Sequence, residues 1–176
     1  KLLRYKRFLT KHQCKKIVRH HEDKQFVRTR SIQHGISNKN TSHIICADQH
    51  DPLLVNVNNS LNGFAKMLID ETNVTSDNST MLNIIRYSKG EYATKHLDAL
   101  TTDEMEQFQL SIQHKFTSII YLDDEAQGGQ LKFDNIGLSM KPTVGDLYFW
   151  MNVENPEGSQ DSAHYVPNVL SLHRSL

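Results

Sequence analysis

The pair His96 and Asp98 is the first candidate for chemistry in this sequence. It follows a β-rich stretch at residues 84–87 and a glycine turn, so we expect an extended backbone there. In an extended chain, residues two apart point to the same side, and an imidazole nitrogen and a carboxylate oxygen can reach one cation. His21 and Asp23 have the same spacing but end a predicted helix, where residues two apart diverge by about 200°. We interpret that second copy as a solvated helix end.

A third ligand is needed to hold a metal ion, and His164 is the candidate, just before another β-rich run. Two histidines and one carboxylate on one face of a metal leave three positions open, which is diagnostic of non-haem Fe(II) oxygenases. Three ligands with open positions do not form a closed structural zinc site. The pattern predicts an Fe(II)-type catalytic site made by His96, Asp98 and His164, while an ordinary histidine at position 164 is the alternative.

Two further strands suggest a pocket for a small acid. Alternation over residues 169–174 puts Arg174 on the same face as two leucines, which implies that this face points inward. A buried guanidinium needs a carboxylate partner, and no acidic residue lies nearby in sequence, so a ligand carboxylate is attractive. The run 115–122 places Thr117 and Tyr121 on one face with an aliphatic residue between them, which suits such an acid. The alternatives are an exposed Arg174 and a mixed, half-buried strand face.

Helical elements are expected before these strands. Thr10 is a good N-cap for a helix in which apolar residues recur at helical spacing. After a short extended piece at residues 42–47, Asp51 and Pro52 predict a second helix that reaches about Asp70. Residues 71–80 are rich in Asn, Ser and Thr, which predicts a loop.

From Met81 onwards, short β-rich runs with turns between them replace helical periodicity. Such spacing is typical of a sandwich or jelly roll. We therefore predict an α+β, mainly β protein with one domain over residues 1–176. Residues 1–80 would be a mostly helical support region, and residues 81–176 would form the β core with the active site.

Composition narrows the function classes. The 176 residues carry 20 basic and 20 acidic side chains, a formal net charge of zero, which argues against an unspecific nucleic-acid binder. No apolar run approaches the roughly 20 residues that span a membrane. Ten histidines hint at metal or proton chemistry. The two cysteines are interpreted as reduced thiols, with one disulfide as the alternative, and the lack of a cysteine framework favours a cytoplasmic protein of prokaryotic or viral origin. Four Asn-x-Ser/Thr sequons keep a eukaryotic ER lumen as the alternative.

Several motifs follow one another in order over more than half of the chain. They are Tyr87-x-x-Gly90-x-Tyr92-x-x-x-His96-x-Asp98, Thr117-x-x-x-Tyr121-Leu122-Asp123-Asp124 with Gly128-Gly129-x-Leu131-x-Phe133, Lys141-Pro142-x-x-Gly145-Asp146-Leu147-x-Phe149, and Asp161-Ser162-Ala163-His164 followed by Pro167, Val169 and Arg174. Together they resemble the prolyl 4-hydroxylase family of Fe(II)- and 2-oxoglutarate-dependent dioxygenases. The resemblance implies a double-stranded β-helix core, a variant of the jelly roll.

The resemblance also implies cofactors and their residues. Fe(II) would bind the three ligands already singled out, and O₂ would take a remaining position. The distal carboxylate of 2-oxoglutarate would meet Arg174, helped by Thr117 and Tyr121, with Tyr87 lining the pocket. Many family members have Lys where Arg174 stands, and Arg does the same work in the oxygen-sensing branch. Ascorbate is a further candidate cofactor.

The implied activity is hydroxylation of prolyl residues in a peptide or protein, with release of succinate and CO₂. Tyr92, His114 and Trp150 are candidate substrate residues, although both aromatic residues could equally belong to the core. The segments 100–109 and 152–160 are candidate groove walls, and the acidic residues of the first could instead form a solvated helix face. Two alternatives remain open: a hydroxylase of another residue or of a small molecule, and a non-catalytic metal-binding jelly-roll module. Neither nucleic acid nor membrane is an expected partner, and the oligomeric state is not determined.

Overall fold

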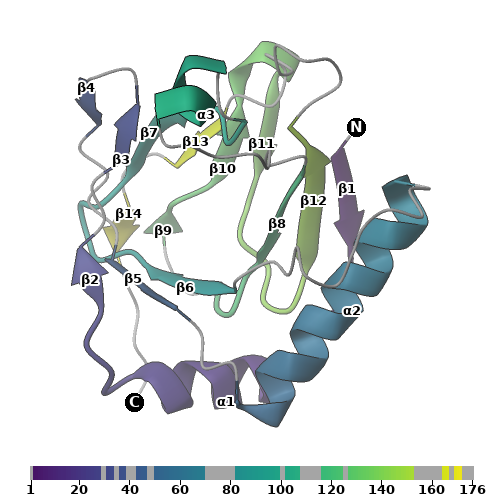
Figure 1. The fold of residues 1–176 in the computed structure, drawn as a ribbon. Coiled ribbons are helices and arrows are strands. Elements are labelled where there is room, and N and C mark those ends of the chain that lie inside the picture. Colours follow the sequence, from purple (N-terminus) through teal and green to yellow (C-terminus); the bar gives the residue numbers. More distant parts are fainter. Residues whose placement is uncertain are drawn as a thin grey trace.

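The protein combines helices and strands, as Figure 1 shows. A computed structural model describes residues 2–28, 31–33, 36–38, 43–46, 50–69, 82–99, 102–107, 116–124, 127–152, 164–166 and 169–171. The helices are α1 (Lys11–His21), α2 (Pro52–Ile69), α3 (Thr102–Gln107) and a 3-10 turn (Asp134–Ile136). The strands are β1 (Leu2–Tyr5), β2 (Val27–Arg28), β3 (Ser31–Gln33), β4 (Ile36–Asn38), β5 (His43–Cys46), β6 (Asn83–Arg86), β7 (Ala93–His96), β8 (Phe116–Ile120), β9 (Gln127–Gly128), β10 (Leu131–Phe133), β11 (Leu138–Met140), β12 (Leu147–Met151), β13 (His164–Val166) and β14 (Val169–Ser171).

Two antiparallel sheets face each other across the interior of the molecule (Figure 1). One has the strand order β1-β12-β8, and the other has the order β11-β10-β13-β7. Smaller sheets are β14-β9, β2-β5-β6 and β3-β4. Side chains from both facing sheets form one buried cluster, whose members are Leu131, Phe133, Met140, Tyr148 and Trp150. The interior between the sheets is therefore a packed core.

The helices α1 and α2 cover the outer face of the β1-β12-β8 sheet (Figure 1). Their buried residues form a second core with Leu147 of β12, and Phe64 of α2 meets Phe149 edge-on. Both predicted helix starts are confirmed. Thr10 and Gln13 form a capping box, and the Asp51 carboxylate accepts a hydrogen bond from the Leu53 backbone at 2.7 Å. Among the described residues, no helix is long and apolar enough to cross a membrane.

Strand β12 has both faces covered. Leu147 and Phe149 face the helices, whereas Tyr148 and Trp150 face the core between the sheets, and all four are buried. A strand covered on both sides reads as a continuous apolar run, because no position on it faces water. In the same way, Ile120 of β8 packs toward the helices while Ile119 and Tyr121 pack into the interior core. The predicted alternation of residues 115–122 is thus confirmed.

The first eighty residues are not only a helical support region. Strand β1 pairs with β12, with Leu2 opposite Trp150, so the N-terminal segment completes one of the facing sheets. Strand β5 confirms the extended piece expected at residues 42–47, and it pairs with β6. Local patterning missed β1 because its Leu-Leu-Arg-Tyr sequence gains a partner only through a strand more than 140 residues away. The loop expected at residues 71–80 lies outside the described residues.

His21 differs from the expectation of a solvated helix end. It ends α1 as expected, but its side chain is 1% exposed, so it is not solvated. Its Nδ1 lies 2.8 Å from the Ile17 carbonyl oxygen one turn earlier, which satisfies that nitrogen inside the core. The next two residues, Glu22 and Asp23, are exposed, so only the end of the motif reaches water. His21 is therefore a core histidine.

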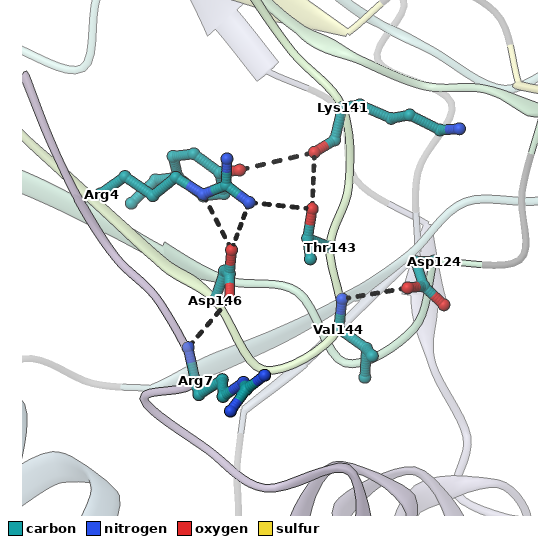
Figure 2. A network of polar contacts seen from close by, with 8 residues as sticks. Arg4, Arg7, Asp124, Lys141, Thr143, Val144 and Asp146 are labelled. Atoms are coloured by element: carbon teal, nitrogen blue, oxygen red, sulfur yellow. Dashed lines mark hydrogen bonds and ion pairs between the residues drawn. The ribbon is translucent and has the colours of Figure 1, made fainter.

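A polar clamp joins the N-terminal segment to the turn before β12 (Figure 2). The buried Asp146 carboxylate accepts hydrogen bonds from Arg4 Nε and Nη2 at 2.8 and 2.6 Å and from the Arg7 backbone at 2.9 Å. Burial alone would raise the pKa of Asp146, but the hydrogen bonds from Arg7 and Arg4 hold it below its usual value. The clamp holds β1 against β12 at the end of β12 that lies away from Asn152.

Gly145, in the turn before β12, is packed tightly against the backbone of the N-terminal segment. Its φ is +82°, and a Cβ at this position would overlap the carbonyl oxygen of Leu9. Gly90 has nearly the same φ, +83°, but no atom lies near enough to meet a Cβ there. Both alanine substitutions therefore carry the left-handed backbone cost, and Gly145→Ala carries the overlap as well. We expect Gly145→Ala to lower the free energy of unfolding by about 1–3 kcal/mol more than Gly90→Ala, measured by urea denaturation. Equal losses would contradict the tight packing.

Candidate active site

His96 and Asp98 lie side by side, as their spacing predicted. His96 is the last residue of β7, and its Nε2 atom lies 3.4 Å from Asp98 Oδ1. Both side chains are about one-fifth exposed, at 19% and 22%, so the pair is reachable from solvent but mostly enclosed. Two ligands of one cation, each about 2.1 Å from it, lie roughly 3 Å apart when they subtend a right angle. The spacing of these two atoms fits shared coordination.

A backbone contact sets the orientation of the His96 ring. Its Nδ1 atom lies 2.7 Å from the Thr94 carbonyl oxygen, which can only accept, so Nδ1 carries a hydrogen and donates it. Burial would lower the pKa of His96, but its hydrogen bonds with Asp98 and Thr94 raise it above the usual value. A cation bound at Nε2 would replace the proton there, because metal ligation needs the free nitrogen lone pair. The Nδ1 contact is the kind that orients metal-bound histidines.

His164 is brought to the same place through the backbone. In the antiparallel pair β13–β7, His164 is the register partner of His96, although 68 residues separate them in the chain. The side chain of His164 lies outside the described part of the structure. Among the described side chains, no group of three or more His, Cys, Asp or Glu residues could hold a metal ion. The imidazole and carboxylate of the described pair are donors that suit Fe(II).

Thr117 and Asn152 form a chain of hydrogen bonds that leads from Asp98 into the core. The Thr117 hydroxyl donates to Asp98 Oδ2 at 2.5 Å, and Asn152 Nδ2 donates to Thr117 Oγ1 at 2.9 Å. Thr117 lies on β8, and Asn152 follows β12, the neighbouring strand in the same sheet. Asn152 has no exposed surface, and among the described residues its Oδ1 has no hydrogen-bond partner. Asn152 was expected only at the start of the candidate groove wall 152–160 and not beside Asp98, although it continues the period-two spacing of Tyr148 and Trp150, which face the interior.

The residues expected around 2-oxoglutarate are described only in part. Tyr121 is half-buried, with its ring edge-on to Tyr148 at 5.6 Å between centroids. Burial, together with the nearby Tyr148 and Tyr87 hydroxyls, raises the pKa of Tyr121 well above its usual value. Tyr121 therefore stays neutral and able to donate a hydrogen bond at physiological pH. Tyr87 is half-buried as well, and Arg174 lies outside the described residues.

The expected substrate residues fall into three different settings. Trp150 is 2% exposed and meets Phe133 edge-on at 5.3 Å inside the core, which fits the core alternative, since so enclosed a ring offers no surface to a peptide. Tyr92 is half-buried, and His114 lies outside the described residues. The segment after Asp98 contains α3, on which Asp103 and Glu106 are exposed, as the helix-face alternative expects.

The chain matches a protein-family model and is similar to curated proteins. The family model described as "2OG-Fe(II) oxygenase superfamily" matches residues 82–175, which include every candidate metal and cosubstrate residue. The chain is also similar to prolyl 4-hydroxylase subunit alpha-2 of Caenorhabditis elegans, with 25% identity over 123 residues. That alignment covers 68% of this chain and 22% of the relative, so the chain spans about a fifth of the length of that protein.

Solved structures share the fold. The viral collagen prolyl hydroxylase of Paramecium bursaria Chlorella virus-1, solved as a 2OG complex, has a TM-score of 0.74 at 17% identity, covering 97% of this chain and 89% of its own. A prolyl hydroxylase from Trichoplax adhaerens, in complex with a hypoxia-inducible factor peptide fragment, has a TM-score of 0.62 at 14% identity, covering 97% and 78%. At such low identity these likenesses concern the arrangement of the chain, and both extend over nearly all of it.

Proposed function

Since the chain belongs to the 2OG-Fe(II) oxygenase superfamily, we propose that it is an Fe(II)- and 2-oxoglutarate-dependent dioxygenase that hydroxylates prolyl residues in a peptide or protein. We also propose that the strands of the two facing sheets that lie within residues 81–176 form a double-stranded β-helix, to which β1 adds one more strand. On this proposal, residues 1–80 belong to the same domain, because β1 pairs directly with β12 of the core.

The observation that carries the proposal is the His96–Asp98 pair. Its two ligand atoms lie 3.4 Å apart, and the Thr94 carbonyl oxygen holds the ring in the tautomer that leaves Nε2 for a cation. The backbone register supports His164 as the third ligand, since it pairs with His96 across β13 and β7. Two histidines and one carboxylate would leave three positions for the cosubstrate and O₂.

The other residues have distinct proposed roles. Arg174 would pair with the distal carboxylate of 2-oxoglutarate, Tyr121 would donate a hydrogen bond to it, and Tyr87 would line the pocket. Thr117, expected at the same carboxylate, has its single hydroxyl hydrogen directed at Asp98. When bound, iron and 2-oxoglutarate would supply the oxidation that places one oxygen atom of O₂ in the substrate and releases succinate and CO₂.

A Pro-containing peptide or protein is the proposed substrate. The three similar proteins described above support a prolyl substrate by name, and one of the similar structures holds a peptide fragment. The exposed acidic side chains of α3, which begins four residues after Asp98, would favour neutral or basic peptides. Among the candidate substrate residues, Tyr92 remains proposed as a contact, and so does His114.

Succinate release tests the proposed function. The protein is incubated with Fe(II), 2-oxoglutarate and a panel of Pro-containing peptides, with and without ascorbate, and peptide masses are recorded. We expect succinate and a peptide mass gain of one oxygen atom, both lost in the His164→Ala variant. Hydroxylation of a free amino acid alone would overturn the peptide proposal. The absence of 2-oxoglutarate turnover under every condition would overturn the enzyme proposal.

A further inference from the structure

We propose that Asn152 and Thr117 form a hydrogen-bond relay that makes Asp98 a one-oxygen metal ligand. Neither would touch the metal, so both are positioning residues. The inference rests on the proposed function, because it presumes that His96 and Asp98 bind a metal ion. Its observations are the contacts from Asn152 to Thr117 at 2.9 Å and from Thr117 to Asp98 at 2.5 Å.

The number of available hydrogens determines the direction of the relay. A carboxylate can only accept, so the single hydroxyl hydrogen of Thr117 goes to Asp98 Oδ2. The Thr117 oxygen must then accept from its other neighbour, and the Asn152 amide nitrogen is the donor that does so. If the Asn152 amide were flipped, its Oδ1 and Asp98 Oδ2 would both have to accept the single hydroxyl hydrogen of Thr117. Asn152 is fully buried, so no solvent competes for its amide.

The relay assigns different roles to the two Asp98 oxygens. Oδ2 is held by Thr117, whereas Oδ1 lies 3.4 Å from His96 Nε2, on the side where a cation would be shared. If Oδ2 were released, the carboxylate could turn and chelate with both oxygens, as carboxylates do around other cations. A second Asp98 oxygen on the metal would fill one of the three positions that cosubstrate and O₂ require. The relay thus preserves the open positions.

The relay also connects the two facing sheets. Asp98 follows β7, which belongs to the β11-β10-β13-β7 sheet, whereas Thr117 and Asn152 belong to β8 and to the end of β12 in the opposite sheet. Thr117 is the register partner of Trp150, two residues before Asn152, so paired backbone holds both relay residues. A carboxylate beyond the end of its own strand is therefore oriented by residues held in the paired strands of the opposite sheet.

Cobalt binding tests the relay without relying on turnover. Co(II) is titrated into the full chain and followed by its visible absorption, for the wild type and for the Thr117→Val, Thr117→Ser and Asn152→Asp variants. Thr117→Val keeps the shape and removes the hydroxyl, whereas Thr117→Ser keeps the hydroxyl. Asn152→Asp replaces the amide donor by an acceptor. The exposed Asn59 on α2 provides the matched control, Asn59→Asp, which adds the same charge far from the relay.

We expect Thr117→Val and Asn152→Asp to weaken Co(II) binding by about 10–100-fold and to change the absorption spectrum, as losses of outer-shell contacts do. Thr117→Ser and Asn59→Asp should keep the wild-type affinity and spectrum. Wild-type affinity and spectrum in both Thr117→Val and Asn152→Asp would overturn the relay, even if the metal-free variants unfold at lower temperature, because the residues would then serve packing alone. A His96→Ala variant tests the metal site itself. If it binds Co(II) as tightly as the wild type does, the metal site of the proposed function is wrong, and the relay is wrong with it.

Discussion

Replacing Asp98 with alanine is expected to abolish succinate formation and to weaken metal binding. The loss of affinity should exceed the factor of about 10–100 that is typical when a residue contacting a metal ligand is removed. The side chain supplies the only described carboxylate within reach of His96 Nε2, at 3.4 Å. Its loss would leave only the two proposed histidine ligands and would release the hydroxyl of Thr117. Turnover is measured as succinate, and affinity is measured by titration with Fe(II) without oxygen or with Co(II).

Lys95→Ala is the matched control for this substitution. Lys95 adjoins His96 on the same strand, but its side chain is half-exposed and contacts Asn135 at 3.0 Å on the surface. Removing it deletes a charge near the site without touching the proposed ligands, so turnover and metal affinity should stay close to wild type. Wild-type metal binding in the Asp98→Ala variant would show that the metal lies elsewhere.

Arg174→Ala is expected to raise the 2-oxoglutarate concentration needed for half-maximal turnover by about 30–4000-fold. Truncating one partner of a buried, hydrogen-bonded charge pair costs about 2–5 kcal/mol, and each 1.4 kcal/mol is tenfold in affinity. Arg174→Lys should recover part of the loss, because an ammonium keeps the attraction but loses the two-pronged contact. The measurement is succinate formation at varied 2-oxoglutarate with saturating Fe(II).

Arg19→Ala provides the comparison on α1, where the side chain is exposed and outside the proposed pocket. It should leave the 2-oxoglutarate requirement unchanged, so that a general effect of lost charge can be separated from a lost contact. An unchanged requirement in Arg174→Ala would mean that the distal carboxylate is held by other residues. Tyr121→Phe would then be the next variant, because Tyr121 is a neutral donor in the interior core.

Local patterns predicted the elements whose causes are local. Thr10 and Asp51 indicated both long helices, because a cap needs only residues two or three positions away. The alternation of β8 gave the correct faces, since strand geometry alone decides which side chains share a side. Strand β7 was expected only as extended backbone around His96, and β13 was missed, because each is three or four residues long and lacks clear apolar alternation. Such strands depend on their neighbours for hydrogen bonds.

The sequence by itself determined that His96 and Asp98 face the same way, because two residues of extended backbone suffice to place both. It also determined, through the order of its motifs, the family expectation that the comparison bore out. Only the tertiary structure decided that His164 pairs with His96 across two strands and that β1 joins the core sheet. It also decided that Thr117 donates a hydrogen bond to Asp98 and accepts one from Asn152. These contacts join segments 19 to more than 140 residues apart. The periodicity of apolar residues in the sequence predicts which face of a helix or strand is buried. Which other element covers that face depends on contacts that form only when the whole chain folds.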